Sequence, residues 1–103
     1  MVGTARETAG DVRAHVVDVR VTEQGFEPNR IDATRGDVVA LRFLRLVEHT
    51  CVKRVIIYLD DHRTIERELP KDLPVTVTLQ LERPGEVGFS CAMAMRGGAI
   101  AVH

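Results

Sequence analysis

Alternation of apolar and polar residues runs through most of the chain and predicts strands rather than helices. From His15 to Thr22 three valines occupy every second position, a period of two that is typical of a half-buried strand. Val75–Leu81 repeats this alternation with threonine and glutamine between its apolar residues. Taken with the turn signals between the runs, the pattern predicts seven strands: His15–Thr22, Arg30–Ala33, Val38–Val47, Val52–Leu59, Val75–Leu81, Glu86–Ser90 and Ala99–Val102.

The segments outside these strands are short or polar. Residues 1–14 lack apolar periodicity and are expected to form a flexible leader, which leaves residues 15–103 as one domain. Asp60–Glu68 is short and charged, so we expect a loop there with one helical turn. Seven short strands separated by turns predict an all-β protein that folds as a β-sandwich.

Composition narrows the class of protein further. A length of 103 residues suits a single domain, and frequent valine with no tryptophan fits a thin β core. The net charge of -1 gives no reason to expect nucleic acid or an anionic membrane as partner, and we expect a monomer. Arginine is abundant, but each arginine has an acidic residue nearby in sequence, which predicts a mixed, solvated surface. No apolar run approaches the length of a membrane span, and Met1–Gly10 does not resemble a signal peptide.

The run Cys91-Ala-Met-Ala-Met95 is the clearest chemical signal, because it places three sulfur atoms in five residues. Thiolate and thioether are soft ligands that select Cu(I) over hard cations. A loop could aim Cys91, Met93 and Met95 at one point, and so could a strand, where alternate residues share a face. The same spacing would also suit three buried core residues, since methionine fills gaps and cysteine is often buried.

A second candidate cluster is Glu48-His49-Thr50-Cys51, at the junction of two predicted strands. His49 and Cys51 are two residues apart and could both reach a metal, although an exposed histidine beside a buried cysteine is the alternative. The sequence has no Gly-x-Ser-x-Gly motif, no phosphate-binding glycine motif and no Cys-x-x-Cys pair. With no catalytic constellation visible, we do not expect an enzyme.

Five runs together resemble the bacterial cupredoxin-like domains that occur as small extracytoplasmic copper proteins or attached to copper-transporting P-type ATPases. The resemblance covers the chain from about His15 to its end, and its last run is the most specific. The runs are Gly25–Ile31 (GFEPNRI), Gly36–Val39 (GDVV), His49–Cys51 (HTC), Leu69-Pro70 and Pro84–Gly98 (PGEVGFSCAMAMRGG).

The resemblance implies a Greek-key β-sandwich with a metal site at one end. Its ligands would come from the start of one strand, at Cys51 or the nearby His49, and from the loop before the last strand, at Cys91, Met93 and Met95. It also implies an extracytoplasmic location, with the signal or anchor not present in this chain. The implied partners are a copper ion and a copper transporter or copper chaperone.

The sequence departs from electron-transferring blue-copper proteins, which use two histidines, one cysteine and a weak axial methionine. No histidine lies between Cys91 and Met95, so the implied ligand set is richer in sulfur and favours Cu(I). The first hypothesis is therefore a Cu(I)-binding module for copper storage, delivery or sensing. Two alternatives stay open: an electron-transfer protein that uses His49, Cys91 and Met95, and a metal-free interaction module with a Cys51–Cys91 disulfide.

Overall fold

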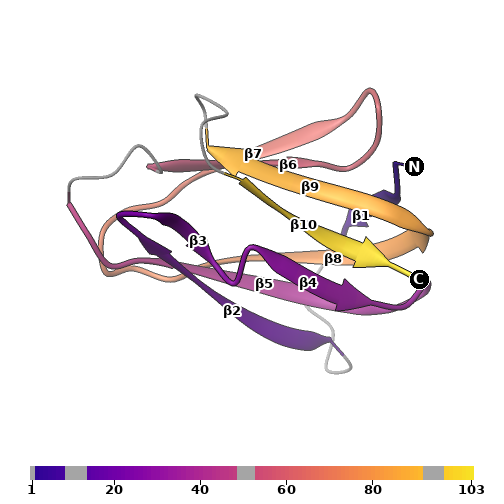
Figure 1. The fold of residues 1–103 in the computed structure, drawn as a ribbon, viewed down its shortest axis with the longest axis horizontal. Coiled ribbons are helices and arrows are strands. Elements are labelled where there is room, and N and C mark those ends of the chain that lie inside the picture. Colours follow the sequence, from indigo (N-terminus) through magenta and orange to yellow (C-terminus); the bar gives the residue numbers. More distant parts are fainter. Residues whose placement is uncertain (1, 9–13, 49–52, 92–96) are drawn as a thin grey trace.

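Two β-sheets packed face to face form the molecule (Figure 1). The computed structural model describes residues 2–8, 14–48, 53–91 and 97–103. Among these residues there is no helix, and therefore none that could cross a membrane. Ten strands lie in this part of the chain: β1 Thr4–Glu7, β2 His15–Thr22, β3 Gly25–Glu27, β4 Arg30–Ala33, β5 Val38–Arg45, β6 Arg54–Tyr58, β7 Thr64–Glu68, β8 Val75–Arg83, β9 Gly85–Cys91 and β10 Gly97–Val102.

The two sheets have five strands each, in the orders β1-β8-β5-β2-β3 and β4-β10-β9-β6-β7. Two of the pairings are parallel, β2 with β5 and β10 with β4, and the other pairings between strands are antiparallel. The chain changes sheet five times: between β3 and β4, β4 and β5, β5 and β6, β7 and β8, and β8 and β9. Strands distant in sequence therefore become neighbours, and their ends meet at the ends of the sandwich.

The core lies between the sheets and is built from the alternation seen in the sequence. Val19 and Val21 of β2 are fully buried, whereas Asp18 and Arg20 face solvent. Successive strand residues point to opposite faces, so one apolar face per strand is enough to form this layer. The inward-facing residues of β5, β8 and β9 complete it: Val39, Leu41, Phe43, Val77, Leu79, Leu81, Val87, Phe89 and Cys91.

The predicted all-β sandwich is confirmed, and β2 and β4 have the predicted bounds. The number of strands was underestimated, because there are ten rather than seven. The three additional strands are β1, β3 and β7, each of five residues or fewer. Short strands of this kind carry too few alternating positions to give a periodic signal.

Two of these strands correct specific expectations. Thr4–Glu7, predicted to belong to a flexible leader, forms β1, which pairs with β8 and buries Ala5 completely. Thr64–Glu68, predicted to lie in a loop with one helical turn, forms β7, which pairs with β6 along its whole length. Ladder hydrogen bonds to an established neighbour hold both strands, and these bonds leave no mark in the local sequence.

Candidate metal site

One of the five predicted metal ligands, Cys91, belongs to the described part of the structure. The other four, His49, Cys51, Met93 and Met95, lie outside the described residues.

Cys91 is the last residue of β9 and is completely buried. It follows Val87 and Phe89 on the inward face of the strand, so its side chain belongs to the core cluster. In the neighbouring strand its register partner is Val55, which is also fully buried. The thiol group thus lies between the sheets at the point where β9 ends.

The pairing of β6 with β9 brings together, at one end of the sandwich, the strand ends that adjoin the two predicted ligand segments. The two strands are antiparallel, and the register pair Val55 and Cys91 joins the start of β6 to the end of β9 (Figure 1). Residues 49–52 precede β6 by one residue, and residues 92–96 connect Cys91 to β10. The described residues that flank both segments therefore occupy adjacent strands at the same end.

Three aromatic rings fill the interior just below this end. Phe26, Phe43 and Phe89 are each at most 4% exposed and meet edge to face. Their ring centroids are 5.1 Å apart for Phe26 and Phe89, and 6.0 Å apart for the other two pairs. Edge-to-face packing at these distances is the favoured arrangement, so the rings form a firm apolar floor next to Cys91.

The backbone at the start of β10 packs closely against Phe89, one of these three rings. A Cβ atom added at Gly98 would lie 2.5 Å from the Asn29 carbonyl oxygen and 2.6 Å from Cζ of Phe89. Only glycine fits there without displacing its neighbours. The described chain on either side of residues 92–96 is therefore held by the buried Cys91 and by the closely packed Gly98.

Arg45 occupies the same end of the interior, a buried position that was not predicted from the sequence. The arginines were predicted to lie on a solvated surface, yet Arg45 is only 8% exposed. It is the last residue of β5 and shares the inward face of that strand with Leu41 and Phe43. The signal was available in the sequence, because Arg45 continues the alternation of those two residues.

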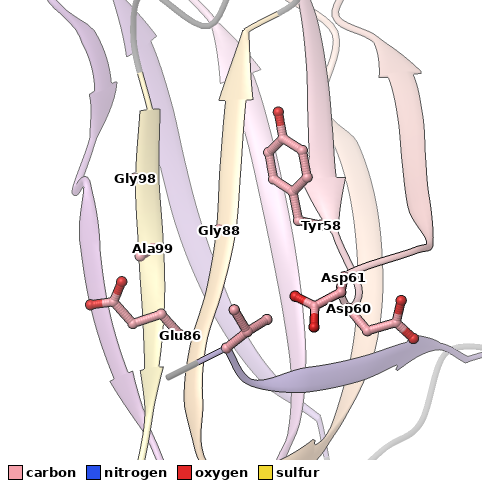
Figure 2. Close-up of a pocket in the computed structure, with 8 residues that line it drawn as sticks. Tyr58, Asp60, Asp61, Glu86, Gly88, Gly98 and Ala99 are labelled. Atoms are coloured by element: carbon pink, nitrogen blue, oxygen red, sulfur yellow. The ribbon is translucent and has the colours of Figure 1, made fainter.

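A shallow groove on the outer face of β9 and β10 is separate from this interior end (Figure 2). Its volume is about 500 Å³, and Tyr58, Asp61 and Glu86 stand around a strip formed by Gly88 and Gly98. The Tyr58 hydroxyl and the Ser90 hydroxyl oxygens lie 3.0 Å apart on the same face. The groove lies on the opposite side of the sheet from the Cys91 side chain.

Asp60, which also lines this groove, uses its carboxylate for hydrogen bonds within the turn between β6 and β7. Its Oδ1 accepts hydrogen bonds from the backbone N–H groups of His62 and Arg63 at 2.7 and 2.8 Å, and its Oδ2 accepts one from Arg63 Nε at 2.7 Å. The backbone N–H of His62, followed by the Arg63 side chain, lowers the pKa of Asp60 to about 2. This carboxylate therefore has a structural role.

The described histidines do not form a metal site. His15, His62 and His103 are exposed, and His103 Nε2 lies 3.1 Å from an Asp32 carboxylate oxygen. Within residues 2–8, 14–48, 53–91 and 97–103, no three His, Cys, Asp or Glu side chains are grouped so that they could hold a metal ion.

Comparison with known proteins agrees with the fold. The cupredoxin-like domain family matches residues 2–102. The chain is similar to a copper binding protein solved in the apo form, with a TM-score of 0.76 and 21% identity over 94% of each chain. It is also similar to the metal binding domain of the Cu(I) exporting P-type ATPase CopA of Streptococcus pneumoniae D39, with a TM-score of 0.74 and 21% identity over 92% of this chain and 91% of that one. Auracyanin B gives a TM-score of 0.75 at 14% identity, over 99% and 98% of the two chains. No curated protein matches.

Proposed function

The chain belongs to the cupredoxin-like domain family, and on that premise we infer that it binds Cu(I) for copper storage, delivery or sensing. The proposed ligands are Cys91, Met93 and Met95 together with Cys51 or His49. The observation that carries the proposal is the position of Cys91, a buried thiol at the end of β9 beside the start of β6.

The surroundings of Cys91 suit a soft, monovalent cation. A thiolate binds Cu(I) well, and the apolar floor of phenylalanine rings keeps water away from it. Copper supplies no reaction in this proposal, since the ion is cargo that the domain takes up and passes on. What the protein contributes is a donor held in place by a β ladder and shielded from exchange with solvent.

The solved structures that resemble this chain include a Cu(I)-loaded domain of a copper exporter and a copper binding protein. In line with them we propose an extracytoplasmic location and a copper transporter or chaperone as partner. The ligand set proposed for this chain contains one histidine at most, which favours copper handling over electron transfer.

Titration of the reduced protein with Cu(I) in the presence of a chromophoric competing ligand tests this function. We expect one copper ion per chain to be withdrawn from the competitor, without a strong visible absorption band. Zinc at the same concentration should not displace the copper, because thioethers suit Cu(I) and add little for zinc.

The same titration separates the alternatives. A strong visible charge-transfer band on addition of Cu(II) would indicate an electron-transfer site. Failure of the fully reduced protein to take up either copper ion would favour a metal-free interaction module, and thiol titration after exposure to air would then reveal whether Cys51 and Cys91 are lost together as a disulfide.

A further inference from the structure

Arg45 is a buried cation, and no carboxylate among the described residues balances its charge. Its Nη1 donates one long hydrogen bond, 3.5 Å, to the Glu48 carbonyl oxygen. Its Nε is buried and has no hydrogen-bond partner among the described residues, and no described carboxylate forms an ion pair with it. A guanidinium is always protonated and carries five N–H donors, so this degree of burial is costly without an anion nearby.

Arg45 and Cys91 occupy equivalent positions on the two facing sheets. Phe43 and Phe89 touch across the interior with ring centroids 6.0 Å apart. Arg45 follows Phe43 on the inward face of β5, and Cys91 follows Phe89 on the inward face of β9. Both strands run toward the same end of the sandwich (Figure 1), so each residue lies one step of about 6.6 Å beyond the contacting rings.

The charge of the proposed copper centre is complementary to that of Arg45. With Cys51 as the second thiolate ligand, a Cu(I) ion held by Cys91 and Cys51 carries a net charge of −1, because thioether ligands are neutral, and this is the form of the site taken here. Charge-assisted hydrogen bonds from a guanidinium to such an anion are strong, and they strengthen further where water is excluded. The buried donors of Arg45 lie at the end of the interior where this negative charge would appear.

We propose that the Arg45 guanidinium is the counter-charge of the copper–thiolate centre at Cys91 and holds it in the interior of the sandwich. Arg45 does not bind copper in this proposal; it is a positioning residue that acts through the thiolates. The inference rests on the proposed function and adds to it the residue that balances the anionic site.

Among the described residues, the shortest hydrogen bond of Arg45 and its β-bridge come from its backbone. Its carbonyl oxygen accepts a hydrogen bond from the Asp72 N–H at 2.9 Å, and its backbone forms a bridge with Lys71. Both interactions use the backbone and survive a change of side chain. Replacing the guanidinium by an apolar chain of similar length should therefore leave the apo protein folded, and it removes a buried charge that no described carboxylate balances.

The test is to measure Cu(I) affinity and apo stability together for three variants. In Arg45→Met we expect Cu(I) affinity to fall about 10- to 100-fold while the denaturant midpoint of the apo protein stays equal or rises. Arg45→Lys keeps the charge and should recover most of the affinity. The control Arg42→Met removes an exposed arginine of the same strand, paired with Asp18 on the outer face, and should leave the affinity unchanged.

Three results would overturn the proposal. Unchanged affinity in Arg45→Met would show that the charge is not used by the site. An equal loss of affinity in Arg45→Met and Arg45→Lys would show that shape matters instead of charge. A lowered apo midpoint with normal affinity would assign the side chain to the fold. If the wild-type protein itself takes up no Cu(I), the proposed function fails and the role of Arg45 fails with it. If the wild type binds Cu(I) but the variants give one of these three results, only the proposed role of Arg45 is rejected.

Discussion

Cys91 is both a fully buried core residue and the proposed principal copper ligand. Replacing it with alanine removes one sulfur atom from a packed interior, which should cost about 1 kcal/mol of the free energy of unfolding. The loss of the thiolate should instead abolish tight Cu(I) binding. Competition titration of Cys91→Ala, with its denaturant midpoint measured in parallel, checks both effects.

Val87→Ala is the matched control for this variant. Val87 lies on the same face of β9, is also fully buried, and carries no metal donor. Its truncation should destabilise the protein by about 2 kcal/mol and leave Cu(I) affinity as it is. Full-strength binding by Cys91→Ala would remove Cys91 from the site.

Asp60 affects a different property, the way in which the stability of the folded protein depends on pH. Its pKa is lowered to about 2 in the folded protein, so its ionised form stabilises the fold. That contribution is complete above the ordinary aspartate value near 3.8 and is lost as the pH falls from about 4 toward 2. Asp60→Asn lacks it, so the difference in unfolding midpoint between wild type and variant should be constant above pH ~4 and shrink toward pH ~2. A difference that does not change with pH would contradict this account.

At the scale of elements, the contact between β10 and the aromatic floor should be sensitive to a single methyl group. Gly98→Ala places Cβ against the Asn29 backbone and the Phe89 ring, neither of which can move freely. We expect a loss of about 1–3 kcal/mol in the free energy of unfolding. Gly88→Ala on the paired strand β9 is the control, because its nearest contact, Tyr58 Cδ2 at 3.6 Å, is ordinary packing. Equal midpoints for the two variants would show that this approach of β10 is looser than described.

The elements also show what the sequence could and could not predict. Strands such as β2 and β8 carry a full apolar face, and their alternation located them within a few residues. β7 could not be found in this way, because Ile65 is its only apolar residue and pairing with β6 holds the strand in place. β1 buries only Ala5, and a single small residue gives no period.

At the scale of the whole molecule, the sandwich places the residues that flank two distant segments on adjacent strands. Spacing alone could not predict that the start of β6 and the end of β9 share one end of the sandwich, because this follows from the pairing of the two strands. Nor did composition reveal Arg45, since an arginine near acidic residues in sequence suggests solvent exposure. Tertiary pairing and burial determine both features.

X-ray absorption at the copper edge of the Cu(I)-loaded protein tests the central claim most directly, because it reports the oxidation state and the atoms bound to copper. The account predicts Cu(I) in a first shell dominated by sulfur, with at least two sulfur scatterers and at most one nitrogen. In the variant Cys91→Ala we expect this sulfur shell around copper to be lost. A shell of nitrogen and oxygen atoms, or a sulfur shell that persists unchanged without the Cys91 thiolate, would contradict the account.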